Sequence, residues 1–520
     1  MLYPRPTTAC LAATLALAGL APALAPAVAT ADPGDIVYSD KFSFGPFPGD
    51  TAFAPRWTVA AEDTAGSTWQ QGVGANGQNG FVAIDGGYIE SNQPFDIDPS
   101  AYYRISVDAR SDTPGQSVGL NFRWNEQTTA DWQNYAAAVP GYASAFSDAN
   151  AQARVRVVGR DTTGLQVDNV RVQEITAVEA AYWGQQVRES LPAEITTTQY
   201  VQADNTIAGT LDKLNAGETV RVVMLGDSVV NDTAHSTWAA QVSSYFPGQI
   251  QVIPSIRNGT GMQFYQGLVE SEDEGLGAVG ASRLDATVLD YDPDLVILGG
   301  VSHGFDAAAY ASVIDQLQAG SDTDILITSE IGGYDYGQGE YLQDDWVYDL
   351  DASGDRFEDQ LLALALDEGV GFADLRGTWG QFLLDTQAAG EDPSDVYRDP
   401  VHLNHLGQEV VGAALAQFFL GGGELPDLTD QLPEAPALVL GLLDLQNLSQ
   451  NFNGQTPYGV DAGDFNGDGE VDLLDFDVYA RSVETQADTT VPEPASLSLL
   501  TLAGLGATLR GSAHRRRRHA

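Results

Sequence analysis

The sequence predicts an α/β protein, with a parallel sheet flanked by helices over residues 216–422 and an all-β region before it. From residue 220 onward, apolar runs such as "VRVVML", "DLVILGG" and "DILITSEI" alternate with segments of helical spacing such as "AAAYASVIDQLQA" and "FEDQLLALALDEG". Near-continuous apolar strands that alternate with helices are typical of a parallel, doubly wound sheet. In such a sheet, ligands bind beyond the carboxyl ends of the strands.

Residues 36–175 follow a different pattern, with short segments of alternating polarity such as "YYRISVDAR", "SVGLNFRW" and "LQVDNVRVQEI". Clusters of Gly, Asp, Asn and Pro separate these segments, which predicts an antiparallel sandwich. The last segment resembles the closing strand of jelly-roll carbohydrate-binding modules. Aromatic side chains could stack on sugars there, although burial in the core is the more common state of any one of them. The candidates are Trp57, Trp69, Trp124 and Trp132. Residues 176–215 are expected to form a partly helical connector.

The composition limits the classes of partner. The chain has 520 residues and a formal net charge of −48, with 72 acidic and 24 basic residues. Such an excess of negative charge argues against nucleic acid and anionic membrane surfaces as partners. The apolar stretch after Cys10, the single cysteine, ends in Ala29-Thr30-Ala31, so residues 1–31 are interpreted as a signal peptide that is removed on export. The mature chain would then contain no disulfide.

Candidate catalytic residues follow the apolar runs. The run "VRVVML" ends at Gly226-Asp227-Ser228, which is how several hydrolases present a nucleophilic serine. A serine nucleophile needs a base within hydrogen-bond reach and a group that orients the base. Asp399 and His402, in "RDPVHLNH" after the last run, offer both from one short segment. The alternative is that Ser228 caps a helix and His402 is an ordinary polar loop residue.

These motifs resemble the SGNH (GDSL-type) hydrolase family over about residues 215–420. The resemblance implies a flavodoxin-like three-layer domain in which Ser228 is the nucleophile, His402 the general base and Asp399 its orienter. It also implies an oxyanion-binding N–H from Gly261 or Gly259, in "RNGTGMQFY".

The third block of the family normally reads G-x-N-D, and its asparagine donates to the oxyanion. This chain has Gly300-Val301-Ser302-His303 at that point, so Ser302 is the expected but shorter donor. Loss of one such donor typically lowers turnover on the order of 10²–10³-fold.

A calcium loop is predicted in "DFNGDGEVDLLD", where oxygen-bearing side chains and one glycine match EF-hand spacing. The segment resembles a dockerin module over residues 433–485, which leaves a cohesin-like partner open. An upstream duplicate at "LLDLQNLSQNF" is preceded by "PEAPALVLG", which lacks the carboxylates, so one structural Ca²⁺ is expected rather than two. The alternative is an acidic surface turn. The direct ligands would be Asp464, Asn466, Asp468 and Asp475, with Glu470 binding through its backbone carbonyl and Asp472 through water.

The C-terminal residues 491–520 combine Val491-Pro492-Glu493-Pro494, an apolar run and a cluster of arginines. In this order the three features resemble a PEP-CTERM sorting tail, which implies processing by an exosortase-type enzyme. The alternative is a weak membrane anchor, because the apolar run is short for a spanning helix.

Together these features predict an exported serine esterase at the cell surface or outside the cell. It would hydrolyse O-acyl esters, with O-acetyl esters of carbohydrates favoured and an acylated polysaccharide as partner, and it would need no cofactor for catalysis. That preference is an analogy with enzymes that carry similar accessory modules. A lipase or general carboxylesterase is one alternative. An inactive carbohydrate-binding or matrix protein at the cell surface is another.

Overall fold

The computed structural model describes residues 36–429, except for 41–56, 61–67, 71–80, 85–86, 93, 112, 114–117, 121–122, 126–127, 143–151, 160–163, 196–199, 202–205, 300–304, 330, 332–349, 400 and 423, and it also describes residues 454–455 and 470–471. The predicted signal peptide and sorting tail lie outside the described residues. Of the predicted calcium ligands, only Glu470 is described, in the short strand pair of β20 (Gly454–Gln455) and β21 (Glu470–Val471).

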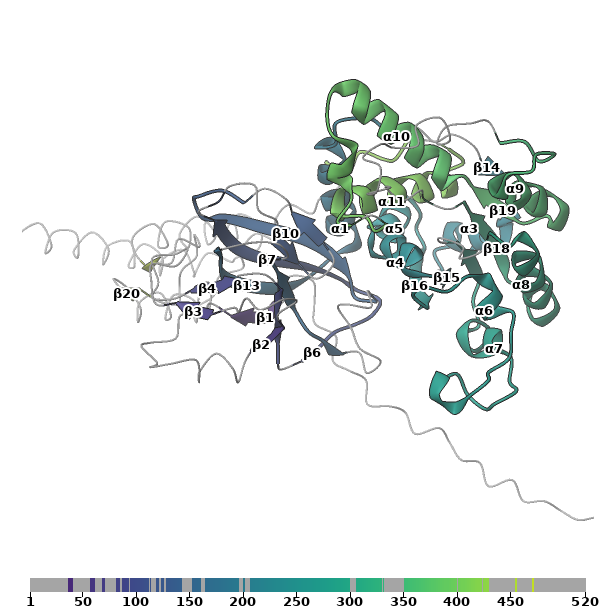
Figure 1. Cartoon of the computed structure of the whole chain (residues 1–520), viewed down its shortest axis with the longest axis horizontal. Coiled ribbons are helices and arrows are strands. Elements are labelled where there is room, and N and C mark those ends of the chain that lie inside the picture. The colour runs from purple at the N-terminus through teal and green to yellow at the C-terminus, as the bar shows by residue number, and fades with distance from the viewer. Residues whose placement is uncertain are drawn as a thin grey trace, which may run out of the picture.

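The C-terminal half is built on a six-stranded sheet, and it confirms the predicted α/β architecture (Figure 1). Five strands are parallel and lie in the order 2-1-3-4-5 of their sequence, while β14 pairs antiparallel with β19 at one edge. Along the sheet, the strands are β14 (Tyr200–Val201), β19 (Gly371–Ala373), β18 (Asp324–Thr328), β17 (Leu295–Leu298), β15 (Thr219–Gly226) and β16 (Gln249–Ile256).

The buried side chains of β15 alternate between two cores, which explains why helices cover both faces of the sheet. Val222 and Met224 pack with α3, α4, α5 and α11, whereas Val223 and Leu225 pack with α6, α7, α8 and α9. A strand buried on both faces reads as a continuous apolar run. The helices are α3 (Ala208–Asn215), α4 (Ser228–His235), α5 (Trp238–Tyr245), α6 (Met262–Tyr265), α7 (Arg283–Thr287), α8 (Ala307–Gly320), α9 (Phe357–Glu368), α10 (Leu375–Ala389) and α11 (His405–Phe419), with short 3₁₀ turns at Glu272–Glu274, Leu289–Tyr291 and Pro393–Val396 (η4).

The N-terminal part consists of antiparallel sheets around one apolar core, which confirms the predicted sandwich. One segment differs from expectation: "SVGLNFRW" forms two short paired strands, β8 and β9, rather than one. One large sheet contains β10 (Gln133–Pro140), β7 (Tyr102–Ser111), β13 (Leu165–Ile175), β4 (Phe81–Ile84), β3 (Thr68–Gln70) and β1 (Ile36–Asp40). The other contains β2 (Trp57–Ala60), β5 (Tyr88–Ser91), β12 (Arg156–Val158), β8 (Val118–Leu120) and β9 (Arg123–Asn125), and a small pair is formed by β6 (Phe95–Asp96) and β11 (Gln152–Ala153).

The structure removes one candidate for sugar stacking. Trp57 is 1% exposed and belongs to the sandwich core, so its ring faces no ligand. Trp132 is half-buried, and the Arg110 guanidinium lies 4.8 Å from the centre of its ring. Trp69 and Trp124 lie in β3 and β9.

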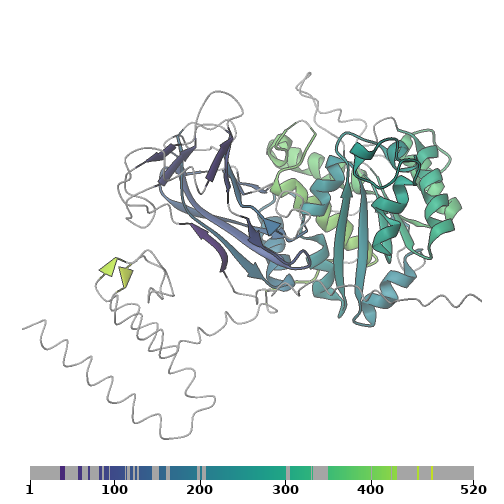
Figure 2. The ribbon, with the colours of Figure 1, turned by 90° about the horizontal axis from the view of Figure 1, so that it is seen from below.

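The segment expected to be a connector packs between the two parts. It contains α1 (Ala177–Glu189), which begins with a capping box between Thr176 and Glu179 and packs against α5. Figure 2 shows the sandwich beside the α/β part. Because the two parts share a buried cluster, a fragment without the sandwich would expose apolar surface. The cluster consists of Tyr102, Ala138, Ile175, Ala180, Ala181, Ala240 and Leu428.

No helix in the described part of the chain is both long and apolar enough to cross a membrane.

Candidate active site

Ser228 is presented by a tight turn between β15 and α4. Gly226 ends the strand, and a side chain there would collide with both backbone and side chain: an added Cβ would lie 2.4 Å from the Gly299 carbonyl oxygen and 2.4 Å from Val230 Cγ2. Asp227 is the N-cap of α4, because its carboxylate accepts the Val229 N–H at 2.9 Å. Ser228 is therefore the first helical residue rather than the cap, and the alternative in which Ser228 caps the helix is wrong.

His402 and Asp399 lie on a closed loop between η4 and α11. Tyr397 and Leu403 form an isolated antiparallel bridge, and the Arg398 N–H donates to the His402 carbonyl oxygen at 3.0 Å. The Asp399 carboxylate also accepts the backbone N–H of His402 at 2.9 Å. The same residue therefore contacts both the backbone and the imidazole of His402. The loop follows the last parallel strand, as expected from the sequence, but with α10 in between.

A continuous hydrogen-bond chain joins the three residues. His402 Nε2 lies 2.8 Å from Ser228 Oγ, and His402 Nδ1 lies 2.8 Å from Asp399 Oδ2 and 2.9 Å from Oδ1. Because a carboxylate can only accept, Nδ1 carries the proton of the neutral ring and Nε2 is left as an acceptor. The Ser228 hydroxyl therefore donates to Nε2, which is the arrangement needed for proton removal from the serine.

The electrostatics of the pair favour this arrangement. Burial by itself would raise the pKa of Asp399, but hydrogen bonds from the His402 ring and from the Val401 and His402 N–H groups outweigh it and hold that pKa well below its usual range. The hydrogen bond to Asp399 raises the pKa of His402, while burial opposes the shift. The side chains of His402 and Asp399 remain 27% and 24% exposed, so a substrate can approach them.

The raised pKa of His402 predicts how the reactivity of Ser228 depends on pH. As the pH falls through the raised pKa of His402, the imidazole becomes protonated and can no longer accept the serine proton. We therefore expect the rate at which a fluorophosphonate labels Ser228 to fall on the acid side with a midpoint above 6.5, the ordinary value for histidine. The profile is measured in buffers in which circular dichroism shows the chain folded. An acid limb centred at or below the ordinary value would contradict the prediction.

The three candidate oxyanion donors differ in what the structure describes. Gly261 lies on the loop after β16, the strand beside β15, and is the N-cap of α6 with an extended backbone. That loop is attached to the nucleophile turn, because the Arg257 N–H and the Tyr265 hydroxyl both donate to the Gly226 carbonyl oxygen, at 2.9 and 2.6 Å. Gly259 has a φ of +70°, which favours glycine. Ser302 lies outside the described residues.

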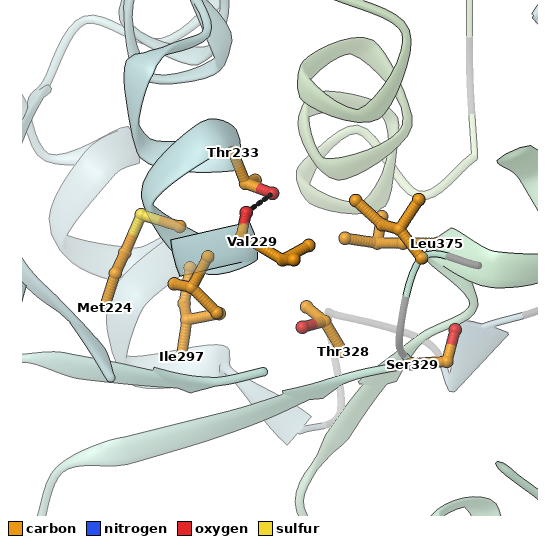
Figure 3. A pocket seen from close by; sticks show the side chains of 9 residues that line it. Met224, Val229, Thr233, Ile297, Thr328, Ser329 and Leu375 are labelled. Carbon is orange, nitrogen blue, oxygen red and sulfur yellow. Dashed lines mark hydrogen bonds between the residues drawn. The ribbon is translucent and has the colours of Figure 1, made fainter. Parts of the chain in front are cut away.

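A small cavity lies beneath α4, between the carboxyl ends of β15, β17 and β18 (Figure 3). Val229 faces it from α4 and Leu375 from α10, while Thr328 and Ser329 border it from the end of β18. Its volume of about 10 Å³ is no more than one water molecule needs, so it is not an acyl-binding pocket. The residues that line it are Met224, Val229, Val230, Thr233, Ile297, Thr328, Ser329, Ile331 and Leu375.

The residues that hold the loop of Asp399 and His402 against α4 were not predicted from the sequence. Asp232, on α4, is 1% exposed and forms an ion pair with Arg398 at 2.8 Å. Gln408 on α11 lies 3.3 Å from the same carboxylate. The available signal was the acid four residues after Ser228, because that spacing places both side chains on one face of a helix.

Within the described residues, no group of three or more His, Cys, Asp and Glu side chains could hold a metal ion. The predicted calcium ligands Asp464, Asn466, Asp468, Asp472 and Asp475 lie outside those residues.

Comparisons with known proteins give a weak similarity. No family model matches the chain, and no curated protein matches it. Among solved structures, the chain is similar to the acetyl xylan esterase AlAXEase over 38% of its own length and 98% of that chain, with 19% sequence identity and a TM-score of 0.27. It is similar to a peptidoglycan O-acetylesterase over 70% of its own length and 80% of that chain, with 13% identity and a TM-score of 0.21. It is also similar to a family two carbohydrate esterase from Cellvibrio japonicus over 74% of its own length and 98% of that chain, with 10% identity and a TM-score of 0.20. Similarities at this level do not show an activity for this chain, so its chemistry is inferred from the geometry of the site.

Proposed function

We propose that this chain is a serine esterase of the SGNH type that hydrolyses O-acetyl esters on carbohydrates. The single observation that carries the proposal is the hydrogen-bond chain from Ser228 Oγ through His402 to Asp399. Its position at the carboxyl edge of a parallel sheet supports the proposal, because this edge is where such sheets bind ligands. The strand order 2-1-3-4-5 is the order of flavodoxin-like sheets, which also supports the assignment to this type.

The proposed reaction has two steps. His402 Nε2 takes the proton of Ser228 as Oγ attacks the ester carbonyl carbon, and the imidazolium then gives that proton to the alcohol oxygen as the C–O bond breaks. Water attacks the acyl-enzyme in the second step, again with His402 as base, and releases the carboxylic acid and the serine. Asp399 remains ionised throughout and stabilises the imidazolium, which agrees with its lowered pKa.

The oxyanion of the tetrahedral intermediate would be bound by the N–H groups of Ser228 and Gly261, with Ser302 as the third donor. Ser228 is the first residue of α4, and the positive end of a helix dipole favours negative charge there. The hydrogen bonds from the Gly261 loop to the Gly226 carbonyl oxygen support the role of Gly261 as a donor, because they link its loop to the nucleophile turn.

A neutral carbohydrate substrate is supported by three features. The sandwich is packed against the α/β part, so a polymer held by one part could present its esters to the other. His402 and Asp399 are about a quarter exposed, which suits an ester on a large chain. The net charge of −48 repels polyanions, so a neutral acetylated polymer is favoured over an anionic one.

The test is an assay of acetate release by the full chain from acetylated xylan and from acetylated pectin, with His402→Ala as the control. We expect release that depends on His402 and is faster from the neutral xylan at low salt. Hydrolysis of long-chain lipid esters alone would indicate the lipase alternative. A folded chain that reacts with no ester and with no fluorophosphonate probe would contradict the proposal and leave the binding-protein alternative.

The remaining modules belong to the same proposal. The protein would be exported by its signal peptide, and an exosortase-type enzyme would process its sorting tail at the cell surface. The dockerin-like loop would bind one structural Ca²⁺, either as a stabilised spacer or as the contact for a cohesin-like partner.

A further inference from the structure

A buried carboxylate connects the helix of the serine to the loop of the histidine. Asp232 lies one helical turn after Ser228 on α4 and is 1% exposed. Its Oδ2 accepts the Leu403 N–H at 2.9 Å, and its Oδ1 accepts Arg398 Nη1 at 2.8 Å. Gln408 Nε2 also donates to Oδ1, at 3.3 Å. Both oxygens of Asp232 are therefore used by the loop and by the start of the helix that follows it.

The two main contacts are placed on either side of the catalytic residues. Arg398 immediately precedes Asp399, and Leu403 immediately follows His402. The loop is closed between them, because Arg398 also donates from its backbone to the His402 carbonyl oxygen and from its side chain to the Leu403 carbonyl oxygen. Asp232 thus holds both ends of the segment 399–402 from the helix that begins at Ser228.

The chemistry of this contact requires a carboxylate. An asparagine could accept the Leu403 N–H, but its amide would then turn two hydrogens toward Arg398, which has only donors. The Arg398 side chain is 11% exposed, so in this variant its guanidinium would lose the ion pair with residue 232 while water could reach it only in part. Removal of one partner of a buried ion pair is strongly destabilising, so residue 232 must be a carboxylate for this contact to form.

We propose that Asp232 is a positioning residue that holds His402 and Asp399 in hydrogen-bond register with Ser228. This inference rests on the proposed esterase function. Asp232 touches neither the substrate nor the reacting atoms, so its effect is on the geometry and charge of the triad. A displacement of about 1 Å at a reacting group can lower turnover on the order of 10²-fold.

Burial raises the pKa of Asp232, but the contacting Arg398 guanidinium and the Leu403 N–H favour its ionised form. In that form its charge also acts on His402. Among the described residues, the charged groups that act on the imidazole are Asp399 on the same loop, Asp232 on α4 and Arg398. The two carboxylates raise the pKa of His402 and the guanidinium lowers it. Removal of the Asp232 charge should therefore move the acid limb of kcat/KM to lower pH, which a purely structural role would not do.

The experiment compares Asp232→Asn with Glu409→Gln in the full chain. Glu409 is a matched control, because it is also fully buried and accepts a backbone N–H, that of Thr237 at 3.0 Å, without contacting the triad. For Asp232→Asn we expect kcat on an acetyl ester to fall on the order of 10²-fold with KM changed less than about twofold. We also expect slower fluorophosphonate labelling and an acid limb at lower pH. Glu409→Gln should lower the thermal midpoint but keep kcat and the acid limb.

A milder variant covers the case in which Asp232→Asn does not fold. Arg398→Lys keeps the positive charge but not the guanidinium geometry, and it should lower kcat in the same direction by a smaller factor. Equal losses in the Asp232 and Glu409 variants, or an unchanged kcat and acid limb in a folded Asp232 or Arg398 variant, would overturn the inference while the esterase function stands. A wild-type chain that neither labels nor hydrolyses esters would instead overturn the proposed function, and the inference with it.

Discussion

Replacement of Ser228 by alanine is expected to lower kcat on the order of 10⁶-fold, the scale seen when a triad serine is removed. The physical reason is that Ser228 Oγ is the atom to which His402 Nε2 is hydrogen-bonded, at 2.8 Å, so the variant loses both the nucleophile and the proton that the base removes. The measurement is acetate release from a soluble ester, together with mass-spectrometric mapping of a fluorophosphonate label. Labelling of the wild type at Ser228 should be absent from the variant.

The fold should tolerate this change. Asp227, not Ser228, supplies the capping oxygen of α4, and alanine is favourable at a helical position. The free energy of unfolding of Ser228→Ala, measured in urea, should therefore lie within about 1 kcal/mol of the wild-type value. A folded variant that retained activity, or a wild-type label found on another serine, would show that Ser228 is not the nucleophile.

Replacement of Asp399 by asparagine is expected to lower kcat on the order of 10⁴-fold, although the two side chains have nearly the same shape. An asparagine oxygen can still accept the backbone N–H groups of Val401 and His402, which would leave its amide hydrogens facing His402 Nδ1. Nδ1 would then have to accept, so the proton would move to Nε2. In that tautomer the ring donates toward Ser228 and cannot remove its proton.

The measurement is kcat for the Asp399→Asn variant against a matched control, Asp392→Asn. Asp392 caps η4 just upstream by accepting the Ser394 N–H at 2.9 Å, so its loss disturbs the same segment without changing the histidine tautomer. The control should stay within about twofold of wild type. Similar losses in the two variants would indicate a general disturbance of the segment and contradict the role of Asp399.

Much of the architecture could be predicted because it depends on local patterns. The run Val222–Leu225 is apolar throughout because the strand is buried on both faces, and that burial marks a parallel sheet. The Asp399–His402 contact was also within reach of prediction, because the partners lie three positions apart and one short loop can supply both. The division of "SVGLNFRW" into two strands was not predicted, because apolar residues keep alternating with other residues through the whole segment in the sequence.

The sequence by itself determined the class of each part and the chemical types at the site: a serine after a buried strand, and an acid and a histidine on one loop. Only the tertiary structure decided that Ser228 and His402, which are 174 residues apart, meet at 2.8 Å. The role of Asp232 depends on the fold even more, because its spacing from Ser228 indicates only a shared helix face and does not distinguish it from an ordinary exposed carboxylate. Its partners Arg398 and Leu403 become visible only when α4 and the histidine loop are packed together, since contacts between distant segments leave no local periodicity in the sequence.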